Sequence, residues 1–161
     1  KKRINLLRYL VAASGYQGMC GGQALDLAAT DKAISLAELE NLHSLKTGAL
    51  LEASVKMAAE CSNNATAQDK EQLARYAKLV GLAYQVRDDI IDITSTEEEL
   101  GKPAGSDLAA NKSTYPALLG LHGAQEKAEN LYQQALQALD TLPYNTQSLS
   151  DFATFIVSRK N

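Results

Sequence analysis

The fold is decided by residues 68–93, which read QDKEQLARYAKLVGLAYQVRDDIIDI. Apolar side chains recur in this stretch at intervals of three and four residues, a spacing that places them on one face of an α-helix. The same spacing dominates the rest of the chain, and we find no convincing run of alternating polar and apolar residues. The sequence therefore predicts an all-α protein.

Local start and stop signals divide the chain into further helices. Residues 35–38, Ser-Leu-Ala-Glu, have the form of a capping box at the start of a helix that runs to about residue 60. Pro116 is tolerated in the first turn of a helix over residues 114–140, which we expect to break at Gly123. Three more elements are expected: one helix over residues 5–27, a polar loop over residues 94–111, and a last helix capped by Ser150 that ends at Ser158. We find no linker or repeat, so residues 1–161 are predicted to form a single domain.

The composition excludes several classes of protein. With 161 residues, of which 45% are hydrophobic and 22% charged, the chain matches a globular domain better than a disordered or collagen-like one. No apolar run approaches the roughly 20 residues that cross a bilayer. The formal charge of −3, from 16 basic and 19 acidic residues, argues against a dedicated nucleic-acid binder. The two cysteines, Cys20 and Cys61, lack metal-site spacing and favour reduced thiols in a cytoplasmic protein.

The long helix carries a cluster of carboxylates near its end. At about 100° per residue, Gln85, Asp88, Asp89 and Asp92 fall within a sector of about 100°. Like charges one turn apart destabilise a helix, so the cluster needs compensation, and Mg²⁺ prefers hard oxygen ligands of this kind. The alternative is a solvated acidic face, which is how most runs of charge behave.

Lys46 interrupts the apolar stripe of the helix that follows residue 35. The side chain either extends along apolar surface to reach water or points into a polar pocket inside the bundle. The neighbouring Thr47 adds a hydroxyl and Gly48 opens space, which would suit an anionic ligand. The spacing leaves both interpretations open.

A row of glycines marks the first predicted helix. Gly15, Gly18 and Gly22 share one stripe with Asp26, and Gln23 lies just beside it. Each glycine inside a helix costs on the order of 1 kcal/mol relative to alanine, so the row needs a reason. Close helix packing and a ligand-binding surface explain it equally well.

The polar loop and the end of the chain contain further basic residues. Lys102 lies in the loop before Asp107, and Lys112 follows the loop. Two lysines that bracket a glycine-containing loop can hold phosphate oxygens as point charges, although ordinary surface lysines are the alternative. For Arg159 and Lys160 we expect a solvated basic segment; cover for a substrate is the second interpretation.

Several strings, taken together, resemble the C-terminal part of the trans-isoprenyl diphosphate synthases, most closely the bacterial farnesyl diphosphate (geranyltrans-) synthases. The matching strings occur in the family's order: MCGGQALDL at residues 19–27, HSLKTGAL at 43–50, GLAYQVRDDIID at 81–92, LGK at 100–102 with Asp107, and KSTYPALLGL at 112–121. They cover nearly the whole chain. The resemblance implies an isoprenoid-synthase-type helical bundle and a Mg²⁺-dependent prenyltransferase that condenses an allylic diphosphate (dimethylallyl or geranyl) with isopentenyl diphosphate.

The resemblance also implies roles for individual residues. In the family, two aspartate-rich motifs hold Mg²⁺ ions. These ions and lysine side chains stabilise the departing diphosphate, and an apolar cavity protects the allylic cation. The matching positions carry these expected roles: Asp88, Asp89 and Asp92 bind metal, with Asp88 the most direct ligand; Lys46, Lys102 and Lys112 hold diphosphate; Lys46, Thr47 and Gln85 are catalytic; Gln23 and Asp26 belong to the pocket.

The chain departs from the family pattern in one respect, because only one DDxxD string occurs in the 161 residues. The family's first aspartate-rich motif lies upstream of the matching region, and the chain opens at Lys1 within a helical pattern. We therefore expect a C-terminal fragment of a longer protein that is inactive by itself. An isoprenoid cyclase or a head-to-head synthase, and a non-catalytic helical scaffold, are the alternatives to the prenyl elongation enzyme.

Family resemblance further favours a homodimer. We expect a cytoplasmic protein, because no secretory signal is visible in the sequence. Cys20, Cys61, His43 and His122 show no catalytic spacing to one another, so packed or surface roles are expected for them.

Overall fold

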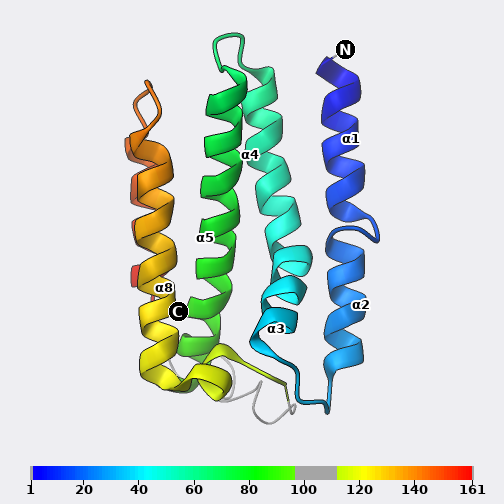
Figure 1. Cartoon of the computed structure of the whole chain (residues 1–161), viewed down its shortest axis with the longest axis vertical. Helices are drawn as coiled ribbons and strands as arrows, with labels where there is room; N and C mark the ends of the chain where they lie inside the picture. The colour runs from blue at the N-terminus through cyan, green and yellow to red at the C-terminus, as the bar shows by residue number, and fades with distance from the viewer. Residues whose placement is uncertain (1, 97–111, 161) are drawn as a thin grey trace.

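The computed structural model describes residues 2–96 and 112–160, and every regular element within these ranges is helical (Figure 1). The elements are α1 (Lys2–Ser14), α2 (Met19–Ala29), α3 (Leu36–His43), a π-helical turn η1 (Ser44–Gly48), α4 (Ala49–Cys61), α5 (Ala67–Thr94), α8 (Tyr115–Asp140) and α9 (Gln147–Ser158). The all-α prediction is confirmed.

The long helix α5 lies at the centre of the arrangement. It packs against α8 and α9 on one side and against η1 and α4 on the other, while α1 packs on α4 and α2 packs on η1. Figure 1 shows α1 and α2 stacked end to end beside the continuous run of α3, η1 and α4. As a result, the end of α2, the start of α3 and the end of α5 meet at the same end of the bundle.

Two capping boxes fix the starts of α3 and α5. The Ser35 hydroxyl accepts from the Glu38 N–H at 3.3 Å, and the Glu38 carboxylate accepts from the Ser35 N–H at 2.8 Å. Thr66 and Asp69 repeat the arrangement at 3.2 and 2.8 Å. Each box satisfies backbone donors that a helix start would otherwise leave unpaired. The capping box expected at Ser35 is confirmed.

The expectation of one helix over residues 5–27 is wrong, because the helix is interrupted between Ser14 and Met19. Gly18 caps α2 with φ −136° and ψ −130°, a backbone conformation outside the helical region. A Cβ at Gly18 would lie 2.1 Å from the Ala13 carbonyl oxygen, so no side chain fits there. Gly15 and Gly18 therefore allow the tight turn between α1 and α2, and they do not lie in a row along one helix.

Two other helix boundaries also differ from expectation. The break in α8 occurs at Gly120, which has φ +73°, and Gly123 lies within the helix. Only glycine adopts this left-handed backbone without strain. The last helix begins one turn before Ser150, because the Thr146 carbonyl already accepts from the N–H groups of Leu149 and Ser150.

The buried core has two parts along α5. One part surrounds Tyr76 and is completed by the ends of α8 and α9. The other surrounds Val86, Ile90 and Tyr115 and includes Leu39 of α3. The second part supports the bundle end where α2, α3 and α5 meet.

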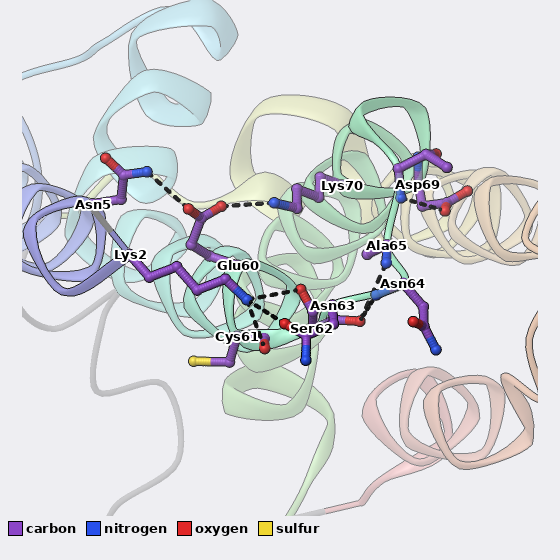
Figure 2. A network of polar contacts seen from close by, with 11 residues as sticks. Lys2, Asn5, Glu60, Cys61, Ser62, Asn63, Asn64, Ala65, Asp69 and Lys70 are labelled. Carbon is purple, nitrogen blue, oxygen red and sulfur yellow. Dashed lines mark hydrogen bonds and ion pairs between the residues drawn. The ribbon is translucent and has the colours of Figure 1, made fainter.

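At the opposite end of the bundle, polar contacts join α1, α4 and the start of α5 (Figure 2). Glu60 of α4 accepts from the Asn5 amide at 2.8 Å and pairs with Lys70 Nζ at 2.7 Å. Lys2 Nζ donates to the carbonyl oxygens of Cys61 and Ser62, both at 3.3 Å. These contacts attach α1 to the turn between α4 and α5.

Within the described ranges no helix is both long enough and apolar enough to cross a membrane. The α1 side chains of Ile4, Leu7 and Val11 are 57%, 61% and 67% exposed, so α1 presents an apolar strip to solvent.

Candidate functional site

The π-helical turn η1 places Lys46 inside the bundle. A π-helical turn is rare, interrupts the regular hydrogen-bond ladder, and occurs frequently at functional sites. Lys46 Nζ lies 2.6 Å from Asp26 Oδ2, and the two side chains are 32% and 15% exposed. The structure thus favours the pocket interpretation of Lys46 over a side chain that reaches for bulk water.

The close approach of α2 to η1 depends on Gly22. A Cβ on Gly22 would lie 2.2 Å from the Lys46 backbone nitrogen and 2.6 Å from the Lys46 Cα. Because Gly22 has no side chain, the two backbones touch, and Asp26, one turn later on α2, reaches Lys46. Close packing explains the glycine at this position of the predicted row.

The end of α5 contributes the acidic side of the site. Gln85, Asp88 and Asp89 line the same cavity as Lys46. Asp89 is buried, and its Oδ2 accepts from the Tyr115 N–H at 2.9 Å, which fixes the carboxylate against the start of α8. The Asp88 side chain is 50% exposed and lies at the edge of the bundle.

These residues enclose a cavity of about 210 Å³. Its wall comes from α2, α3, η1, α5 and the segment that precedes α8: Asp26, Ala29, Ile34, Leu39, Leu42, His43, Lys46, Gln85, Asp88, Asp89, Lys112, Ser113 and Thr114. Lys112 Nζ lies 4.0 Å from Asp26 Oδ2, so two ammonium groups approach one carboxylate. Two lysines and two aspartates of α5 that line one cavity are suited to an anion bridged by a cation.

A stacked pair of rings supports the cavity wall. The His43 and Tyr115 rings lie 5.6 Å apart at an interplanar angle of 22°. Burial, together with the charges of Glu40 and Asp89, raises the pKa of Tyr115, so its hydroxyl stays neutral. The packed role expected for His43 agrees with this position.

Residues 3–148 match the family model for polyprenyl synthetase. The chain belongs to the polyprenyl synthetase family.

Relatives and a solved structure agree with this assignment. The chain is 48% identical to farnesyl diphosphate synthase of Haemophilus influenzae, over 100% of this chain and 55% of that protein. It is 43% identical to farnesyl diphosphate synthase of Escherichia coli, over 99% and 54%. The structure matches geranyltransferase of Helicobacter pylori, crystallised with magnesium and isoprenyl diphosphate, with a TM-score of 0.79, 34% identity, and 96% and 50% coverage. The chain thus spans about half the length of these relatives.

The structure brings some of the expected site residues together and leaves others apart. Six of them line one cavity: Asp26, Lys46, Gln85, Asp88, Asp89 and Lys112. Gln23 is exposed, and Thr47 and Asp92 are not among the side chains that line the cavity. Lys102 and Asp107 lie outside the described residues. Their expected roles stay predictions.

The carboxylates of α5 determine whether the cavity fits Mg²⁺. In residues 2–96 and 112–160, no three His, Cys, Asp or Glu side chains are gathered closely enough to hold a metal ion by themselves. Mg²⁺ usually takes one or two protein carboxylates and completes its shell with water and substrate phosphates. The half-exposed Asp88 carboxylate at the cavity edge fits that requirement, with Asp89 beside it.

Arg159 is the residue that sequence reasoning placed wrongly. Its side chain is only 10% exposed, and Nη2 lies 2.9 Å from Asp88 Oδ1. A solvated segment is therefore the wrong interpretation for Arg159. No local signal could have found the contact, because 71 residues separate the partners.

Proposed function

We propose that this chain is part of a prenyltransferase of the farnesyl diphosphate synthase type, whose substrates are an allylic diphosphate (dimethylallyl or geranyl) and isopentenyl diphosphate. In the reaction the allylic carbon–oxygen bond breaks, a carbon–carbon bond forms to the isopentenyl double bond, and a proton leaves to restore an alkene. The observation that carries the proposal is that Lys46, Lys112, Asp88 and Asp89 line one cavity. The names of the close relatives agree with it.

The lysines would hold the diphosphate. Lys46 now pairs with Asp26, and it can exchange that carboxylate for a phosphate oxygen without leaving the cavity. Lys112 approaches the same carboxylate from the segment before α8. Positive charge next to the departing oxygens lowers the barrier to ionisation. Lys102 enters the proposal on its resemblance alone.

Other residues of the cavity would stabilise the developing allylic cation. Gln85 lines the cavity one turn before Asp89, where its amide oxygen can face positive charge on carbon. Thr47 follows Lys46 in the π-helical turn and is assigned the same task on its resemblance. Ile34, Leu39 and Leu42 give the cavity an apolar side that excludes water from the cation.

The proposed metal ligands are Asp88, Asp89 and Asp92, with Asp88 in direct contact. Bound Mg²⁺ would supply Lewis-acid charge to the diphosphate oxygens as they leave. Asp92 is buried one turn beyond Asp88 and would support the charge of the site from within the bundle. Gln23 and Asp26 are proposed as pocket residues, and Asp26 holds Lys46 in place.

Replacement of Asp88 tests the proposal. In the full-length protein, Asp88→Asn should lower incorporation of labelled isopentenyl diphosphate by about 100-fold or more, because it removes charge from the reacting end of the cavity. The helical signal and thermal midpoint should change little. Asp151→Asn is the matched control, because this exposed aspartate of α9 contacts only Gln147 in the described ranges. Equal loss of helical structure and turnover in the Asp88 variant would assign Asp88 a structural role.

Two further properties belong to the proposal. Residues 1–161 alone are expected to show no turnover, since relatives with this activity in their names are nearly twice as long. We also propose a homodimer, on the family resemblance alone. Sedimentation of the full-length protein measures its oligomeric state. The cytoplasm stays the expected compartment.

A further inference from the structure

The segment that follows α9 is bound to the end of α5. The Arg87 guanidinium donates two hydrogen bonds to the Arg159 carbonyl oxygen, from Nε at 2.9 Å and from Nη2 at 2.7 Å. The Ser95 hydroxyl donates to the Lys160 carbonyl oxygen at 2.9 Å. Backbone groups of two successive residues are thus held by two side chains of α5 and its C-cap, which gives residues 159–160 a defined position.

The Arg159 side chain then reaches the edge of the cavity. Its guanidinium carbon lies 4.1 Å from the centroid of the Tyr84 ring, a geometry in which cation and ring attract each other. Its Nη2 donates to Asp88 Oδ1 at 2.9 Å. The arginine is thereby placed on the same carboxylate that the proposed function assigns to the metal.

Two guanidinium groups share this small region. Burial, together with the positive charge of Arg159, lowers the pKa of Arg87. Asp88 supplies the opposite charge that makes the position of Arg159 favourable. A divalent cation at Asp88 would remove that advantage and repel the guanidinium, because like charges a few ångströms apart are unfavourable.

We propose that Arg159 is a built-in countercation of Asp88, which a divalent cation must displace before it can bind. Residues 159–160 are then a latch on the metal-binding edge of the cavity, closed while Asp88 holds no metal and open when it does. The inference rests on the proposed function only in that Asp88 binds the cation. It adds a competitor that the reaction itself does not require.

Cation affinity in the full-length protein tests the latch. Free Mn²⁺ is measured by electron paramagnetic resonance in the presence of inorganic diphosphate. Arg159→Gln should tighten Mn²⁺ binding about threefold to fivefold, the scale of a partly exposed ion pair. Lys160→Gln is the matched control, because it removes the same charge from the neighbouring, exposed position and should change the affinity by less than half as much. Arg87→Lys keeps its charge but loses the two-bond hold on the segment, so it should tighten binding by an intermediate factor.

A second measurement, by nuclear magnetic resonance, follows the latch directly and does not depend on a measured affinity. The Nε–H resonance of Arg159 should sharpen toward that of a mobile, solvent-exposed arginine when Mg²⁺ and inorganic diphosphate are added. Asp88→Asn should produce the same resonance without Mg²⁺, because the partner charge is gone. An Arg159 resonance that stays unchanged at saturating Mg²⁺ would overturn the latch.

The outcomes separate the two proposals. Mn²⁺ binding that Asp88→Asn does not weaken would overturn the proposed metal site, and the latch with it. Binding that depends on Asp88 but responds equally to Arg159→Gln and Lys160→Gln would overturn the latch alone. That result would mean that general charge, and not the contact with Asp88, sets the affinity.

Discussion

Two lysine–carboxylate pairs lie at opposite ends of the bundle and have nearly the same geometry. Lys70 and Glu60 join the turn between α4 and α5 with 2.7 Å between Nζ and Oε2, and Lys46 and Asp26 lie 2.6 Å apart at the cavity (Figure 2 shows the first pair). Hydrogen bonds from Lys70 and then from Asn5 lower the pKa of Glu60. What differs is the surroundings: only the second pair borders a cavity that also contains Lys112 and Asp88. A lysine–carboxylate pair by itself therefore does not identify a binding site.

Removing each lysine in turn tests whether only Lys46 contributes to ligand binding. Lys46→Ala should raise the KM for the allylic diphosphate by about 10-fold to 100-fold, because it removes a charged hydrogen bond to the ligand. Lys70→Ala should leave KM within a factor of two, since Lys70 contacts Glu60 at the far end of α5. Steady-state kinetics of the full-length protein, with calorimetric titration of inorganic diphosphate, measures both.

A matched stability measurement keeps this result interpretable. Each variant loses one ion pair, so their melting temperatures should fall by similar small amounts. A Lys46 variant with wild-type affinity for diphosphate would show that Lys46 and Asp26 form a structural pair like Lys70 and Glu60. The cavity would then lose its assigned anion site.

Glycine positions around Lys46 offer the next largest effect. Gly22→Ala should cost about 1–3 kcal/mol of stability, because the new Cβ meets the Lys46 backbone and the π-helical turn must shift. Diphosphate affinity should fall with it. In Gly48→Ala, the nearest atom to the new Cβ is the His43 carbonyl oxygen at 3.7 Å, an ordinary contact, and its backbone is helical. That variant should gain up to about 1 kcal/mol.

Thermal unfolding of the two alanine variants measures the contrast. The two substitutions are chemically identical and lie in neighbouring segments, so a difference between them reports the close approach of α2 to η1. Equal stability of both variants would mean that the α2 backbone can move away from Lys46 freely. The position of Asp26 against Lys46 would then not depend on Gly22.

The long helix and the cavity were predictable from the sequence for different reasons. Period and capping residues set α5, so the predicted range of 68–93 differs from Ala67–Thr94 by one residue at each end. Asp88, Asp89 and Lys46 were predictable as a group because five strings in family order carried them. Spacing alone had left a solvated face and a lysine exposed to water as open alternatives.

The rest could not be predicted because it depends on contacts between distant segments. Gly120 and Gly123 are equivalent as sequence signals, yet it is Gly120 that adopts φ +73°. The contact between Arg159 and Asp88 joins helices α9 and α5 through tertiary structure. The break after Ser14 removed two glycines from a stripe that assumes a continuous helix.

The smallest predicted effect compares the buried tyrosines of the two core parts. The Tyr76 hydroxyl donates to the Leu149 carbonyl at 2.7 Å, whereas the Tyr115 hydroxyl is buried with no hydrogen-bond partner in the described part of the chain. At pH 7, Tyr76→Phe should cost about 1 kcal/mol, because it removes this hydrogen bond. Tyr115→Phe should be neutral or slightly stabilising, because it removes a hydroxyl that gains nothing from burial. Chemical denaturation measures both.

The stability at alkaline pH gives a second test of the buried Tyr76 hydroxyl. Burial raises the pKa of Tyr76 to about 12, so the folded state keeps a proton that the unfolded chain releases near pH 10. The stability that this proton provides is complete below pH 10 and is lost as the pH rises toward 12. Tyr76→Phe should therefore flatten the decline in stability over that range, even though the variant is less stable at pH 7. If the stability of Tyr76→Phe declined as steeply as that of the wild type, the Tyr76 hydroxyl would be exposed to water in the folded wild-type protein. The contrast between Tyr76 and Tyr115 would then disappear.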